Sequence, residues 1–176
     1  MSETVIQVTS LGKRIKGKTI LEDISFEINQ GDCVALIGPN GAGKTVLMSC
    51  ILGDKKPSSG QVLIDGKAGK AKNKIAVLLQ ENTIPNSLKV EELIAFFQSI
   101  SDNPLTNQEV QELLQFKEDQ YQQFADKLSG GQRRLLAFVL CLIDKPKILF
   151  LDEPTAGMDT STRQRFWEIV NELKKA

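Results

Sequence analysis

Gly38-Pro39-Asn40-Gly41-Ala42-Gly43-Lys44-Thr45 is the stretch of this sequence that decides its fold. It matches the pattern G-x-x-x-x-G-K-[ST], and it lies between the apolar run 33–37 and a segment with helical periodicity, the strand–loop–helix context that the pattern requires. Glycines let a backbone wrap closely around phosphates, and the N–H groups at a helix N-terminus carry partial positive charge. The stretch therefore predicts a polyphosphate-binding loop, with Lys44 on the β- and γ-phosphates and the Thr45 hydroxyl on Mg²⁺. The competing interpretation is a glycine-rich turn without a ligand.

The composition around this loop is that of an ordinary globular chain. With 176 residues, 41% hydrophobic and 25% charged, we expect one domain, 1–176, with its own core. The 22 basic and 22 acidic side chains cancel, so no overall field favours nucleic acid, and an anion site must be local. The longest apolar run, 135–143, is too short to cross a membrane, and the N-terminus lacks the pattern of a secretory signal. We expect a cytoplasmic chain.

Two kinds of strand pattern flank the loop. The segments 4–8 and 20–28 alternate apolar and polar residues, which predicts an antiparallel front sheet. The runs 33–37 and 147–151 are solidly apolar, which is typical of strands buried on both faces of a parallel α/β sheet. The sequence therefore predicts an α/β fold with a parallel core sheet and an antiparallel front sheet.

Helical periodicity separates the two apolar runs and continues after the second. Apolar residues at spacings of three and four predict helices over 90–100, 108–116, 131–143 and 161–175. Thr106 with Glu109 forms a capping box at the start of the second helix, and Ser161 with Gln164 forms a similar cap at the start of the last. We expect a helical subdomain, approximately 88–143, inserted into the sheet.

A pair of acids follows the second apolar run. Asp152 and Glu153 come directly after 149–151, at the carboxyl end of a strand where open α/β sheets bind their ligands. Asp152 would hold Mg²⁺ directly or through water, and Glu153 would act as general base on the attacking water. In isolation two acids after a strand are more often a helix cap or loop; the phosphate loop favours the catalytic interpretation.

A second glycine pair precedes the helix over 131–143. Ser129 and Gln132 form a Ser-x-x-Gln cap, and Gly130 and Gly131 leave bare N–H groups at the positive end of that helix. This predicts a second phosphate-binding surface, against the alternative of a plain capped helix start.

Together the stretch Leu128-Ser129-Gly130-Gly131-Gln132, the phosphate loop and Asp152-Glu153 resemble the ATPase subunits of the ABC transporter family. The resemblance runs from about Val5 to the C-terminus, with the motifs in the family's order. It implies a P-loop NTPase core and an ATP-binding subunit that hydrolyses ATP to ADP and phosphate to drive transport. Gln80 would be the Q-loop glutamine that contacts Mg²⁺ and takes part in catalysis, and 156–159 would be the D-loop.

The same resemblance implies the partners. The family forms head-to-tail dimers, here a homodimer, in which the signature helix of one subunit, the helix opened by the signature motif 128–132, closes on the phosphates held by the other. The dimer works with an integral-membrane permease, so we expect a peripheral protein on the inner face of the cell membrane, and no nucleic-acid partner.

Two positions depart from the family pattern. The aromatic residue that stacks on adenine is replaced by Ile15, which can cover the base but lacks the ring-on-ring interaction. The family's switch histidine would lie beyond Ala176, and the sequence contains no histidine. The resemblance therefore describes a subunit truncated at its C-terminus before that histidine.

Three functional interpretations remain. The run 153–159 with Arg165-Phe166-Trp167 favours a transporter ATPase of the drug and antimicrobial export branch. A soluble ABC ATPase is a second interpretation, although those proteins usually carry tandem domains or basic extensions. A nucleotide-binding interaction or regulatory module without turnover is a third, and the absence of histidine favours it.

Overall fold

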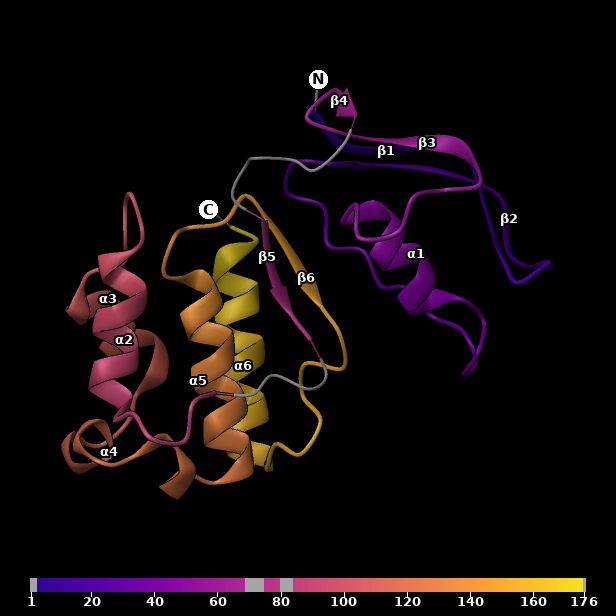
Figure 1. Ribbon diagram of the computed structural model, residues 1–176. Helices are drawn as coiled ribbons and strands as arrows, with labels where there is room; N and C mark the ends of the chain where they lie inside the picture. The colour runs from indigo at the N-terminus through magenta and orange to yellow at the C-terminus, as the bar shows by residue number, and fades with distance from the viewer. Residues whose placement is uncertain (1–2, 69–74, 80–83, 176) are drawn as a thin grey trace. The chain divides into compact units, whose positions relative to one another are not determined.

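The computed structural model describes residues 3–68, 75–79 and 84–175. The chain divides into two compact units, 1–72 and 73–176, and each is described by itself (Figure 1). The first contains β1 (Thr4–Ile15), β2 (Lys18–Asn29), α1 (Lys44–Ile51), β3 (Ser59–Ile64) and β4 (Lys67–Ala68). The second contains β5 (Ile75–Leu78), α2 (Val90–Ser99), α3 (Asn107–Leu114), α4 (Glu118–Gln122), a 3₁₀ turn (Ala125–Lys127), α5 (Gly130–Leu142), β6 (Ile148–Leu151) and α6 (Thr160–Leu173).

An antiparallel sheet in the order β2-β1-β3-β4 forms most of the first unit, as the sequence predicts. Ile6 lies opposite Ile28 of β2 and Ile64 of β3, and register shifts interrupt both pairings further along β1. Ile6 and Val8 alternate with partly or fully exposed neighbours and are each 2% exposed. Burial of this alternating set stabilises the sheet.

The run 33–37 is not the buried strand that its composition predicts. Its residues have no strand geometry and all are exposed, and the side chain of Ile37 is 90% exposed. A strand exists through hydrogen bonds to a neighbour, and among the described strands none pairs with 33–37. Without a neighbouring strand the apolar side chains of this run remain uncovered.

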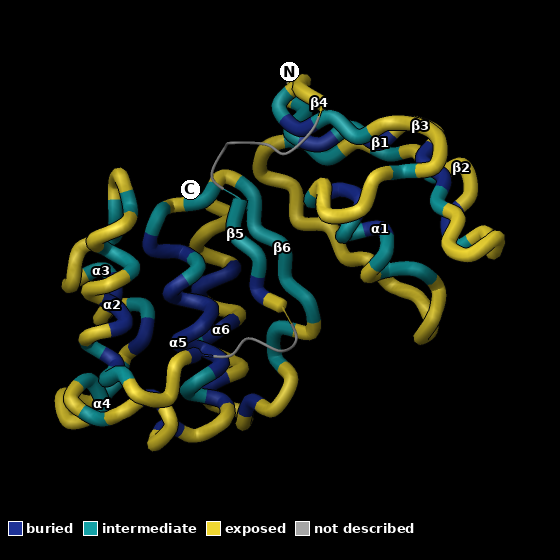
Figure 2. The backbone as a smooth tube through the Cα atoms, in the orientation of Figure 1, coloured by how far each residue is buried: buried dark blue, intermediate teal, exposed yellow. Residues whose placement is uncertain are grey.

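The second unit is built around α5. Strands β5 and β6 pair in parallel, with Ile75 opposite Ile148 and Leu78 opposite Leu151. Helices α5 and α6 run side by side next to this pair, and α5 is buried over almost its whole length (Figures 1 and 2). The rings of Phe138 and Phe166, both 0% exposed, pack with centroids 4.4 Å apart.

The predicted helices form within one or two residues of their expected ends. The capping box of α3 is present: Glu109 N donates to the Thr106 hydroxyl at 3.2 Å, and Thr106 N donates to the Glu109 carboxylate at 2.6 Å. The residues of β6 are half-buried, not buried on both faces as their composition predicts, and among the described strands β6 pairs with β5. The helices of 88–143 share their unit with β5, β6 and α6, so the helical subdomain stays a prediction.

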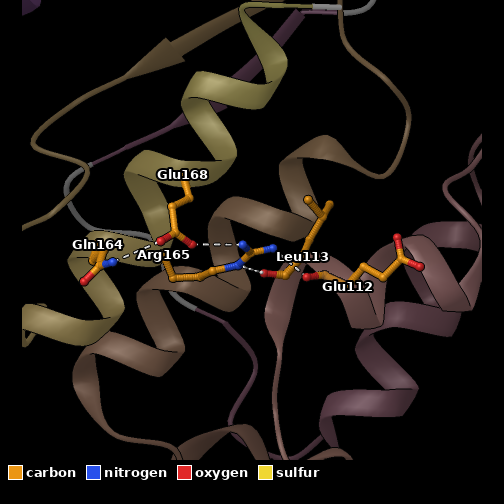
Figure 3. Close-up of polar contacts among 5 residues, drawn as sticks. All are labelled: Glu112, Leu113, Gln164, Arg165 and Glu168. Atoms are coloured by element: carbon orange, nitrogen blue, oxygen red, sulfur yellow. Dashed lines mark hydrogen bonds and ion pairs between the residues drawn. The ribbon is translucent and has the colours of Figure 1, made fainter.

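Arg165 joins α6 to the end of α3 (Figure 3). Its guanidinium donates to the carbonyls of Glu112 (2.6 Å) and Leu113 (3.0 Å), and it pairs with Glu168 at 3.1 Å. The last carbonyls of a helix have no partner within the helix, so an arginine from a neighbouring helix satisfies them. In the part of the chain that the structure describes, no helix has the length and hydropathy to cross a membrane.

Candidate nucleotide site

The phosphate loop adopts a backbone that its glycines make possible. Gly41 and Gly43 have φ angles of 83° and 91°, in the left-handed region that other residues rarely adopt. A Cβ added to Gly43 would lie 2.9 Å from Leu21 Cδ2 and 3.2 Å from the carbonyl oxygen of Ile20, on β2. Gly43 is therefore required both by its own conformation and by the close approach of the front sheet.

Helix α1 begins directly out of this loop at Lys44. Its N-cap, Gly43, has no side chain to accept from the first amides of the helix, so those amides and the helix dipole remain suited to an anion. Lys44 Nζ donates to the carbonyls of Gly38 (2.6 Å) and Pro39 (2.9 Å), which places its positive charge against the loop. The residues present fit a polyphosphate, and Thr45 is exposed beside them on the first turn of α1.

The two acids lie at the carboxyl end of β6, as the sequence predicts. Asp152 N donates to the carbonyl of Leu78 at 2.9 Å, which continues the parallel pairing one residue past the strand. Asp152 is half-buried and Glu153 is exposed. Glu153 has a φ of 44°, a left-handed conformation that costs a non-glycine residue about 1–2 kcal/mol. The turn after β6 therefore holds its acidic residue in a strained backbone.

The second glycine pair opens α5, and its predicted cap is present. Gln132 N donates to the Ser129 hydroxyl at 3.1 Å, and Ser129 N donates to the Gln132 side chain at 3.1 Å. Gly130 is exposed, whereas Gly131 is buried: a Cβ there would lie 3.2 Å from both Met158 Cα and Asp159 Oδ2. The structure thus brings the signature residues against 157–159, the stretch that the resemblance assigns to the D-loop.

The N-cap of α6 is Asp159, not Ser161 as the sequence analysis predicts. The Asp159 carboxylate accepts from Thr162 N (3.0 Å), the Thr162 hydroxyl (2.8 Å) and the Ser161 hydroxyl (2.7 Å). These bonds, first the one from Ser161, hold the pKa of the Asp159 carboxyl well below its usual range. A carboxylate can accept all three donors at once, which a serine hydroxyl cannot, so the N-cap lies two residues earlier.

Arg134 is the residue of this region that the sequence analysis missed. Its side chain is buried (9% exposed), and it donates to the carbonyls of Asp152, Glu153 and Pro154 and to that of Leu79. Burial lowers the pKa of its guanidinium, and the nearby Asp152 carboxylate is the largest opposing influence. The sequence does contain a signal for it. Arg134 is charged, yet the helical periodicity places it on the face of α5 that is expected to be buried.

The remaining predicted site residues belong to different units or lie outside the described residues. Ile15 ends β1 in the first unit and is 36% exposed. Gln80 lies outside the described residues. Thr45 belongs to the first unit and Asp152 to the second, so the magnesium site stays a prediction, although hydroxyl and carboxylate oxygens are ligands that Mg²⁺ prefers. Within the described ranges no three histidine, cysteine, aspartate or glutamate side chains cluster as a metal site would need.

A phosphate loop leading into a helix, with acids after a parallel strand, defines a P-loop nucleotide-binding protein. Comparison with known protein families matches residues 21–156 to the ABC transporter family. The chain belongs to this family, and its fold is that of an ABC ATPase: a P-loop core with parallel and antiparallel sheets and helices.

Relatives of this chain include both import and export proteins. A methionine import ATP-binding protein of Legionella pneumophila (strain Paris) is 33% identical over 97% of this chain and 54% of its own length. A zinc import ATP-binding protein of Rickettsia bellii is 30% identical over 99% and 73%. A Nod factor export ATP-binding protein of Ralstonia nicotianae is 33% identical over 98% and 56%. The chain thus spans about half to three quarters of the length of these relatives.

Solved structures show the same fold. The ATP-binding subunit of an ABC transporter superposes with a TM-score of 0.81 at 26% identity, covering 97% of this chain and 75% of that one. A dimeric ATP-binding cassette in a post-hydrolysis state, bound to ADP and phosphate, superposes with a TM-score of 0.78 at 20% identity, covering 96% and 82%. At the lower identity the likeness concerns the fold alone.

Proposed function

We propose that this chain is the ATP-binding subunit of an ABC transporter, hydrolysing ATP to ADP and phosphate to drive transport. The observation that carries the proposal is the start of α1: a helix that emerges from a left-handed glycine loop with no side-chain cap and with Lys44 against the loop. Such a start has donors and positive charge for phosphates and no acceptor of its own. Membership of the ABC transporter family makes the phosphates those of ATP.

The proposal gives each site residue a role. Lys44 would exchange its two carbonyl acceptors for phosphate oxygens, and Ile15 would cover the adenine. Glu153, exposed at the end of β6, would take the proton of the attacking water. Thr45, Asp152 and Gln80 would hold Mg²⁺, which would supply positive charge to the phosphates.

The partners belong to the same proposal. Gly130, exposed beside the Ser129–Gln132 cap, would offer its backbone amide to phosphates held by a second copy, in a head-to-tail homodimer. The dimer would dock on an integral-membrane permease at the inner face of the cell membrane. The run 153–159 with Arg165-Phe166-Trp167 favours export, while the relatives include importers as well as an exporter.

The test is steady-state phosphate release from Mg²⁺-ATP by this chain, with Glu153→Gln as the active-site variant and Glu172→Gln, an exposed residue of α6, as the matched control. We expect Glu153→Gln to lower kcat by about 10²–10⁴-fold, the usual worth of a general base, and Glu172→Gln to leave it unchanged. ATP binding without turnover in the wild-type chain would contradict hydrolysis by this chain and favour a regulatory nucleotide-binding module.

A further inference from the structure

We propose that Arg134 is a positioning residue whose guanidinium fixes the peptide path from Asp152 to Pro154 and thereby aims the Glu153 carboxylate. The inference deepens the proposed function and rests on it where Glu153 is taken as the general base. The backbone part of the inference stands on the geometry of the second unit alone.

The guanidinium of Arg134 contacts three successive carbonyls after β6. Nη2 donates to Asp152 O at 2.8 Å and Glu153 O at 3.3 Å, and Nε donates to Pro154 O at 3.2 Å. Nη1 donates to the carbonyl of Leu79, which follows β5. One buried cation therefore holds the carboxyl ends of both parallel strands, and its planar fork fixes their spacing.

The backbone of Glu153 needs such a hold. Successive residues of an extended strand direct their groups to opposite sides, so three carbonyls in a row can meet one cation only where the chain turns. The φ of 44° at Glu153 provides this turn. The conformation is unfavourable for glutamate, and it lies outside the extended region that a residue before proline prefers. The local sequence does not favour this turn, whereas the carbonyl contacts with Arg134 do.

Arg134 also connects two predicted site elements. It lies two residues after Gln132, whose side chain accepts from Ser129 N at the start of α5. A movement of the signature helix would therefore pull on the carbonyls that flank Glu153. Arg165 provides the structural comparison, because it also donates to two carbonyls of a neighbouring segment, but those belong to Glu112 and Leu113 of α3.

The first test measures the backbone and needs no turnover. Ala156 N donates to Glu153 O at 3.2 Å, so exchange of the Ala156 amide, followed by NMR, reports on the turn. We expect Arg134→Gln to accelerate this exchange about tenfold or more relative to the Phe138 amide in the core of α5, because hydrogen bonds from a charged group are lost. Arg165→Gln should leave the ratio of the two rates unchanged.

Arg134→Lys keeps the protein testable if Arg134→Gln does not fold. An ammonium retains the charge but cannot span the carbonyls of Leu79 and Pro154 with a fixed fork, so we expect a smaller rise in the same ratio. An Ala156 amide that exchanges no faster, relative to Phe138, in a folded Arg134 variant would overturn the proposal.

The second test uses turnover. We expect Arg134→Lys to lower kcat about tenfold or more with the KM for ATP within about threefold, because a misplaced base slows chemistry without weakening binding. The double variant Arg134→Lys/Glu153→Gln should have a kcat no lower than that of Glu153→Gln alone. If the double variant loses kcat by the product of the two single-variant losses, the positioning role is overturned, since Arg134 would then act independently of Glu153. If the wild-type chain has no turnover, the proposed hydrolysis fails, and the exchange ratio alone decides the role of Arg134.

Discussion

Replacing Gly131 by alanine tests the packing of the signature helix against 157–159. The added Cβ would lie 3.2 Å from both Met158 Cα and Asp159 Oδ2, and ordinary contacts are about 3.5–4.0 Å, so the segment must move by about 0.3–0.8 Å. Asp159 cannot move freely, because its carboxylate accepts three hydrogen bonds at the start of α6. Overpacking of this kind costs about 1–3 kcal/mol of the free energy of unfolding.

Gly130→Ala is the matched control for this change. Its Cβ would find only the carbonyl of Gly157, at 4.0 Å. Alanine is favoured over glycine within a helix by up to about 1 kcal/mol, and this term is shared by both variants. The free energies of unfolding of the two variants should therefore differ by about 1–3 kcal/mol, with Gly131→Ala the less stable.

Urea denaturation of both variants measures this difference directly, provided that the slope against denaturant is the same for both. Equal midpoints would refute the reasoning, because they would show that 157–159 yields to the new methyl group at no cost. A lower midpoint for Gly130→Ala would refute it as well.

Three further variants test other parts of the second unit. Thr106→Ala removes the hydroxyl that caps α3 and should lower the free energy of unfolding by about 1 kcal/mol in urea denaturation. Phe138→Ala, at a fully buried ring, should cost about 3–5 kcal/mol by the same measurement, and a smaller loss would mean that the core collapses around the cavity. The pKa of Asp159 is lowered in the folded state, so its contribution to stability is complete above the unfolded-state pKa of about 4 and is lost as the pH falls through the folded-state value. The Tm difference between wild type and Asp159→Asn should therefore shrink on acidification, and a constant difference would contradict the assignment.

Features set by neighbouring residues could be predicted from the sequence. The Thr106–Glu109 box and the Ser129–Gln132 cap each depend on a few adjacent positions, and the structure contains both. The catalytic and ligand roles of the site residues stay predictions.

Features that depend on distant segments could not be predicted. The composition of 33–37 indicates a buried strand, but strand formation depends on a neighbour that composition does not reveal. Arg134 finds its acceptors after β5 and after β6, as far as 55 positions away along the chain. Asp159 rather than Ser161 caps α6, because the Asp159 carboxylate accepts from all three donors within its reach.

Isothermal titration calorimetry of Mg²⁺-ATP against this chain measures whether the phosphate loop binds a nucleotide. Lys44→Ala removes the charge that lies against the phosphate loop, and Lys55→Ala removes an equal charge from an exposed position in the same unit. We expect wild type and Lys55→Ala to bind alike and Lys44→Ala to bind at least about tenfold more weakly, because charge-assisted hydrogen bonds to phosphate are lost. Equal affinities for all three, or no binding by the wild-type chain, would contradict nucleotide binding by the phosphate loop.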